Sequence, residues 1–156
     1  MQDKIMHFIE EFEARLQTLK DEYEEDKAEC EFEEGDIFWS ILKDGQDMEF
    51  EWRADKYYVA CYEQGNVFKT REEAKFEVEK RKVLHELKQL GRPFKPHEDN
   101  YAIAFSHIGG FKIVGYITTV ASYGNYYFDS TEEAKKAIDK IGEDRIKKYL
   151  FGIDEE

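Results

Sequence analysis

The chain has 156 residues, of which 41% are hydrophobic and 15% aromatic, and its net charge is −13. This length and composition suffice to bury a core, which excludes an intrinsically disordered chain. No apolar run approaches the roughly 20 residues that span a bilayer. The acidic balance disfavours direct binding to nucleic acid or to anionic membranes, because affinity for phosphates comes mainly from Lys and Arg.

The first 27 residues are expected to form an amphipathic helix. Their apolar residues alternate spacings of four and three, the pattern of a heptad seam, with Phe8 broadening it. The seam covers fewer than three heptads. Two interpretations stay open: the helix docks on its own domain, or it self-associates as a coiled coil in a homodimer. The seam residues are Ile5, Ile9, Phe12, Leu16, Leu19 and Tyr23.

An acidic connector, EEDKAECEFEEG, follows at residues 24–35. Residues 1–35 hold 13 acidic against 4 basic side chains, so most of the excess charge lies in the first quarter of the chain. The start of the chain carries acids where a secretory signal needs a basic segment and then an apolar one. Cys30 and Cys61 are isolated, as is usual for reduced cytosolic thiols. We therefore expect a soluble, cytoplasmic protein.

Residues 35–91 are expected to form a first unit of sheet and helix. DIFWSILK and DMEFEWRA are strand candidates joined at Asp44–Gly45, a hairpin signal, and KYYVACY is expected to be a third strand. After a turn at Gly65, Thr70 and Glu73 form a capping box that starts a long helix. Gly91 and the following proline end that helix.

Residues 100–152 repeat this arrangement in shorter form. YAIAFS and FKIVGYITTVA are expected strands around Gly109–Gly110, and YGNYYFDSTEEA repeats the turn, phenylalanine and capping box of QGNVFKTREEA. Ser130 and Glu133 start the second helix, and Gly142 separates it from a last short one. The predicted fold class is α+β: an N-terminal amphipathic helix followed by two similar small antiparallel β-sheet-plus-helix units packed together.

The sequence shows no pattern typical of an enzyme. Its four histidines are scattered without Cys or carboxylate at metal-ligand spacing, and the glycine pairs match no phosphate-binding loop. We expect no catalytic residues, no metal site and no cofactor. Lys80, Arg81 and Lys82 belong to a modest basic cluster that continues to Lys95. Its charges balance those of nearby acids, as on a solvated helix face.

Aromatic residues are more numerous than two small cores need, and surface Tyr and Trp are typical anchors of protein interfaces. The competing interpretation is that the two sheets cover each other's aromatic faces. As candidates for partner binding we take the acidic connector together with four aromatics. These residues are Glu24, Glu25, Glu29, Glu31, Glu33, Glu34, Trp39, Tyr57, Tyr123 and Tyr126.

The segment GDIFWSILKDG with QGNVFKTREEAKFEVEKRKVLHEL resembles small, mostly uncharacterised proteins of bacteriophages and prophages of Gram-positive bacteria. YYFDSTEEAKKAIDKIGEDRIKKYLFG is similar to the C-terminal segment of many of them, so the resemblance covers about residues 33–152. It brings no established activity. A looser analogy exists with the arm-binding domains of phage integrases, from which the acidic charge departs.

These observations favour a non-enzymatic, phage-encoded protein that binds and inhibits a bacterial defence protein in the host cytoplasm. The partner would be a basic nucleic-acid-binding nuclease, and the acidic first quarter would act as a nucleic-acid mimic, as an anti-CRISPR protein can. The first alternative is a self-associating phage accessory or assembly protein. The second is a nucleic-acid-binding regulator that uses the sheets and the Lys80–Lys95 region.

Overall fold

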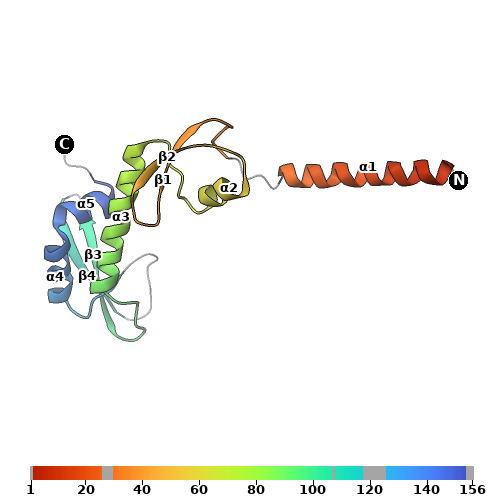
Figure 1. The fold of residues 1–156 in the computed structure, drawn as a ribbon. Helices are drawn as coiled ribbons and strands as arrows, with labels where there is room; N and C mark the ends of the chain where they lie inside the picture. The colour runs from red at the N-terminus through yellow and green to blue at the C-terminus, as the bar shows by residue number, and fades with distance from the viewer. Residues whose placement is uncertain (1, 26–29, 107, 118–125, 154–156) are drawn as a thin grey trace. The chain divides into compact units, whose positions relative to one another are not determined.

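The computed structural model describes residues 2–25, 30–106, 108–117 and 126–153, with the backbone alone at 2–4, 20–25, 116 and 117. It confirms the predicted α+β class, with an N-terminal helix and two two-stranded sheets accompanied by helices (Figure 1). The chain forms two compact units. The first comprises Met1–Ile37 and Glu51–Asn66, and the second comprises Phe38–Phe50 and Val67–Glu156.

The first unit contains the helices α1 (Gln2–Glu25) and α2 (Lys56–Glu63). Its core is aromatic: the Trp52 ring is 2% exposed and lies 5.4 Å from the ring of Phe32 and 6.0 Å from that of Tyr58, between centroids. The ring of Tyr62 closes the cluster against Phe32 and Trp52. Trp52 is therefore a core residue and not a surface anchor.

The prediction of a strand at KYYVACY is wrong, because this segment is α2. Asp55 caps the helix, and its Oδ1 accepts hydrogen bonds from the backbone N–H groups of Tyr57 and Tyr58 at 2.9 and 3.0 Å. At the other end Gly65 has a φ of 67°, and its N–H donates to the carbonyl of Tyr62. The N–H of Asn66 donates to the carbonyl of Cys61, which completes a Schellman motif. Gly65 thus ends a helix and does not turn a strand.

The second unit begins with a hairpin of β1 (Ile37–Ile41) and β2 (Asp47–Glu51), as predicted. The turn places Gly45 at a φ of 84°, a conformation that glycine adopts without the steric cost of a Cβ. The long helix α3 (Arg71–Leu90) follows. It ends where predicted, with the Gly91 N–H donating to the carbonyl of Leu87.

A second hairpin is formed by β3 (Asp99–Ser106) and β4 (Gly110–Ile117), which pair antiparallel from Asp99–Ile117 to Ser106–Gly110. Helices α4 (Thr131–Ile141) and α5 (Glu143–Phe151) complete the chain, separated at Gly142 as predicted. Helix α4 packs on β3 and β4, and α3 packs on both α4 and α5. The C-terminal helices therefore build one core with α3.

That core is aliphatic at its centre. The spacing of Ala134, Ala137, Ile138 and Ile141 predicts one buried helix face, and all four are at most 5% exposed in α4. Arg145 of α5 holds α3 through a bidentate ion pair, with its Nη2 2.9 Å from Oε1 of Glu86. The buried residues of the core are Val83, Leu87, Phe128, Ala134, Ala137, Ile138, Ile141 and Ile146.

The recurring phrase has the same structure in both places. Thr70 Oγ1 accepts from the Glu73 N–H at 3.2 Å, and Ser130 Oγ accepts from the Glu133 N–H at 3.2 Å. Each glutamate reaches back one residue further than predicted: Glu73 accepts from the N–H of residue 69 and Glu133 from that of residue 129. The cap is therefore a capping box displaced by one residue at its second bond.

The phenylalanine before each cap joins a sheet. Phe68 forms an isolated antiparallel bridge with Trp39 of β1, and Phe128 forms one with Tyr101 of β3. Each bridge has two backbone hydrogen bonds, of 2.8 and 2.9 Å at Phe68 and of 3.1 and 2.9 Å at Phe128. Phe128 is 2% exposed, whereas Phe68 is half-buried. In both repeats, the residue just before the cap therefore pairs with one strand of the hairpin, and the helix starts immediately afterwards.

Candidate protein-binding surface

Helix α1 presents an exposed apolar face. We call the residues Ile5, Ile9, Phe12, Leu16 and Leu19 the α1 seam; the exposed fraction of these side chains lies between 42% and 58%. The predicted sixth member, Tyr23, lies in the helix, but its side chain is outside the described residues. Every seam residue whose side chain the structure describes is exposed, and both interpretations, docking on its own domain and self-association, stay predictions.

The acidic connector ends in a fixed turn, residues 31–36, which we call the acidic turn. Glu34 anchors it: one carboxylate oxygen, Oε2, accepts from the Ala54 N–H at 3.1 Å. Asp36 Oδ2 accepts from the Glu33 N–H at 2.7 Å, and the backbone of Asp36 pairs with that of Trp52. Glu31, Glu33 and Glu34 are all exposed. Backbone hydrogen bonds therefore hold an acidic surface in one conformation.

Three other predicted acids lie beyond this description. Glu24 and Glu25 belong to the end of α1, where the backbone alone is described, and Glu29 lies outside the described residues. The structure therefore brings Glu31, Glu33 and Glu34 together and leaves the other half of the predicted acidic set untested.

The four predicted aromatics differ in exposure. Tyr57, at the start of α2, is 70% exposed and belongs to the same compact unit as the acidic turn. Trp39 and Tyr126 are half-buried, and Tyr123 lies outside the described residues. The Arg71 guanidinium lies 5.1 Å from the centroid of the Trp39 ring, and Tyr126 packs on the core of the second unit. Tyr57 is thus the one of the three described aromatics that offers most of its surface.

The basic cluster of α3 is neutralised by its own helix. Lys80 and Arg81 pair with Glu77, at 3.5 and 3.1 Å, and Lys82 Nζ lies 2.6 Å from Oε1 of Glu79. These are the i,i+3 and i,i+4 pairs expected of a solvated helix face. A nucleic-acid contact here would have to compete with acids already in place.

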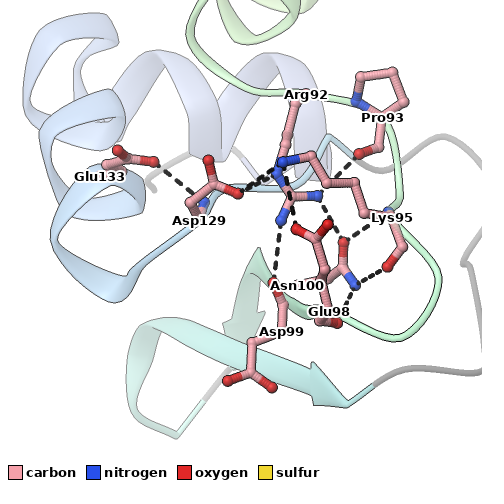
Figure 2. A network of polar contacts seen from close by, with 8 residues as sticks. All are labelled: Arg92, Pro93, Lys95, Glu98, Asp99, Asn100, Asp129 and Glu133. Atoms are coloured by element: carbon pink, nitrogen blue, oxygen red, sulfur yellow. Dashed lines mark hydrogen bonds and ion pairs between the residues drawn. The ribbon is translucent and has the colours of Figure 1, made fainter.

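The most connected polar network surrounds Arg92 and Asn100 (Figure 2). Asn100 is fully buried; its Oδ1 accepts from Arg92 Nη1 at 2.7 Å and from the Lys95 N–H at 3.0 Å. Its amide donates to the carbonyls of Lys95 and Glu98. Arg92 also pairs with Asp129, and this hydrogen bond lowers the pKa of that carboxyl below its ordinary value.

This network has a structural role. It closes the loop between α3 and β3 onto the residue that precedes the Ser130 cap, so it ties the end of the first repeat to the second. Among the described residues, no buried side-chain nitrogen or oxygen is without a hydrogen-bond partner. The network therefore leaves no buried polar group directed at a ligand.

A groove of about 780 Å³ lies in the second unit. Phe76 and Tyr149 form its apolar side, with ring centroids 5.1 Å apart. Its rim carries Arg71 and Asp47, whose Nε and Oδ2 lie 2.6 Å apart, and this hydrogen bond lowers the pKa of Asp47 and raises that of Arg71. The rest of the rim carries two further acids and three further bases, Glu72, Glu79, Lys75, Lys82 and Lys148. Acids and bases thus lie together around the groove, and Lys82 is paired with Glu79.

Sequence reasoning missed several contributors to exposed apolar surface, among them Met6 and Met48. Met6, beside the α1 seam, is 58% exposed, and Met48 of β2 is 50% exposed. The signal for Met6 was present, since it adjoins Ile5 and widens the stripe at the N-terminal end of the helix. In β2, Met48 is exposed although Phe50, which alternation places on the same face, is half-buried.

Nowhere in the described part of the chain do three or more His, Cys, Asp or Glu side chains gather in a metal-binding arrangement. None of the helices in that part has the length and apolar content needed to cross a membrane.

Comparison with known proteins found no matching family model, no matching curated protein and no matching solved structure. The functional argument therefore rests on the residues of this chain.

Proposed function

We propose that this chain is a non-enzymatic inhibitor that binds a basic, nucleic-acid-handling defence protein of bacteria and acts as an acidic mimic of nucleic acid. The observation that carries the proposal is the acidic turn, whose exposed glutamates are held by backbone hydrogen bonds. A preorganised surface binds better than a mobile one, because less conformational freedom is lost on association.

Charge and aromatic content support the same proposal. Of the net charge of −13, residues 1–35 contribute 9 units, as 13 acids against 4 bases. A strongly acidic surface attracts a basic cleft from a distance and accelerates association. Tyr57, exposed in the same unit, is the kind of side chain that anchors protein interfaces. That the inhibitor is phage-encoded is what the resemblance of residues 33–152 implies, whereas its place in the host cytoplasm is expected from the acidic start of the chain and the isolated cysteines.

The test begins with capture of a partner from a Gram-positive bacterial lysate and its identification by mass spectrometry. Affinity for that partner is then measured against salt concentration. Six contacts of the phosphate-mimicking kind predict a loss of affinity on the order of 10³-fold between about 50 and 200 mM salt. A partner that binds equally well across this range contradicts an electrostatic mechanism.

Two variants with the same change in net charge show whether binding depends on the connector glutamates themselves or on the total charge of the chain. One variant changes the six connector glutamates to Gln, and we expect it to abolish binding and inhibition. The matched control removes six charges from exposed acids elsewhere, and it should bind nearly as the parent does. Unchanged inhibition in the first variant overturns the mimicry mechanism. The first set is Glu24, Glu25, Glu29, Glu31, Glu33 and Glu34; the control set is Glu49, Glu51, Glu63, Glu98, Asp99 and Asp139.

A further inference from the structure

The α1 seam has the spacing of a helix-pairing surface. Its residues follow one another at intervals of four, three, four and three, which average 3.5 residues. A helix with this repeat keeps its apolar side chains facing a second helix that winds around it. The flat face of a sheet offers no such match. The spacing therefore matches the seam to a second helix.

The apolar area suffices for a pair of identical chains. Seven large apolar side chains of α1 are exposed, by 42% to 68%. An aromatic side chain offers on the order of 150–250 Å², so at these exposures roughly 100 Å² per side chain is left to be covered. Two helices together then offer about 1,400 Å², above the roughly 1,200 Å² at which specific protein interfaces begin. The seven residues are Ile5, Met6, Phe8, Ile9, Phe12, Leu16 and Leu19.

We infer that the α1 seam pairs with α1 of a second copy of this chain, and that the two helices run antiparallel. The inference stands apart from the proposed function, because it requires no defence protein. It commits to a self-complementary interface, in which each residue contacts a residue of the same seam in the other chain.

Electrostatics decides the direction. Residues 21–25, DEYEE, carry four acids and no base, and acids continue into the connector, whereas residues 2–5, QDKI, are balanced. A parallel pair would place the two acidic ends side by side. In an antiparallel pair they lie at opposite ends, and with residue 14 at the centre of the pair they are separated by about 27 Å along the axis, well beyond the screening length of roughly 10 Å. The antiparallel arrangement also opposes the two helix dipoles favourably.

One register uses the whole seam. The seam residues alternate between the two apolar positions of the heptad. In an antiparallel pair, a residue at one of these positions faces a residue at the other position in the second helix. Facing Ile9 with Leu19 sets Phe12 opposite Leu16, and it sets Ile5 opposite position 23. Ile9, Phe12, Leu16 and Leu19 then each face an apolar residue of the same seam, and the two-fold axis passes near residue 14.

The first measurement is the mass of the full chain in solution by light scattering. We expect two chains per particle. Changing Phe12 and Leu16 to Asp should reduce the mass to one chain, because both lie at the centre of the seam. The matched control changes His7 and Ala14, on the outer face, to Asp and should keep the pair. Circular dichroism shows that each variant is folded. A monomeric parent chain overturns the inference, as does a control that dissociates like the seam variant.

The second measurement fixes direction by disulfide formation. Cys30 and Cys61 are first changed to Ser, since both are free thiols. One chain then carries Ile9→Cys, and a second, differently tagged chain carries Leu19→Cys. On oxidation of the mixture, the mixed disulfide should exceed both like-with-like disulfides by at least tenfold. Dominance of the like-with-like products shows a parallel pair and overturns the antiparallel direction, and a dimer without any disulfide overturns the register.

Discussion

The buried amide of Asn100 provides a sharp test of how the second unit is held together. Its side chain makes four hydrogen bonds, to Arg92, to the backbone N–H and carbonyl of Lys95 and to the carbonyl of Glu98, at 2.7 to 3.0 Å. The change Asn100→Ala removes all four at once and leaves the partner groups behind.

The expected cost follows from the fate of those partners. A polar group left buried without a hydrogen bond costs about 1–3 kcal/mol. Glu98 is exposed and Lys95 is half-buried, so water recovers part of this energy at their backbone groups. Arg92 keeps its bonds to Asp129 and to the carbonyls of residues 93 and 99. We therefore expect Asn100→Ala to lower the free energy of unfolding by about 3 kcal/mol.

The assay is urea unfolding followed by far-ultraviolet circular dichroism. Asp99→Ala is the matched control, because Asp99 is exposed and it contributes a backbone carbonyl to the network; its effect should stay within about 0.5 kcal/mol. Asn100→Asp keeps the two accepted bonds and loses the two donated ones, so it should also destabilise the protein. A stability of Asn100→Ala equal to that of the Asp99 control would refute the reasoning.

Three further predictions concern the second repeat. Ser130→Ala should lower the free energy of unfolding by about 1 kcal/mol. Thr131→Ala, one residue inside the helix, should lower it by less. Equal losses in urea unfolding would show that the Ser130 cap does not stabilise the helix. Phe128→Ala should cost about 3–5 kcal/mol and Phe128→Leu clearly less, and the reverse order would contradict the burial argument. Because Arg92 lowers the folded-state pKa of Asp129, the ion pair stabilises the protein above the unfolded pKa of about 3.9 and loses its effect as pH falls through the lower folded value. The stability difference between the parent chain and Asp129→Asn should therefore shrink on acidification below about pH 4, and a difference that grows there would contradict the sign.

Local signals made most of the fold predictable. The caps at Thr70 and Ser130, the stop at Gly91 and the break at Gly142 each depend on neighbours within four residues, and all four are present. The buried face of α4 was predictable for the same reason, because one helix period places its alanines and isoleucines together.

The segment that became α2 shows where this reasoning fails. A short apolar run such as KYYVACY fits a strand or a short helix equally well by periodicity, and its Tyr and Val favoured the strand. The deciding signals flanked it: Asp55 as a cap before the run and Gly65 as a helix end after it. A run bounded by both signals reads as a helix.

The candidate site was predictable in charge but not in exposure. Composition showed that acids crowd the first quarter, yet only the structure shows Glu34 anchored to Ala54 and the acidic turn fixed. Likewise, no sequence pattern distinguished Trp52, which became a core residue, from Tyr57, which is exposed. Exposure depends on which distant elements meet, and that information is not local.

The residues that build the core and the exposed residues proposed for binding lie in different units of the chain. Each repeat uses its phrase to attach a phenylalanine to a hairpin and start a helix, and α3 of the first packs on α4 and α5 of the second. Helices of both repeats thus build the core of the second unit. The first unit holds the exposed α1 seam, the acidic turn and Tyr57. Because these residues are exposed and contribute nothing to the core of the second unit, we expect substitutions there to change binding without changing the stability of that unit.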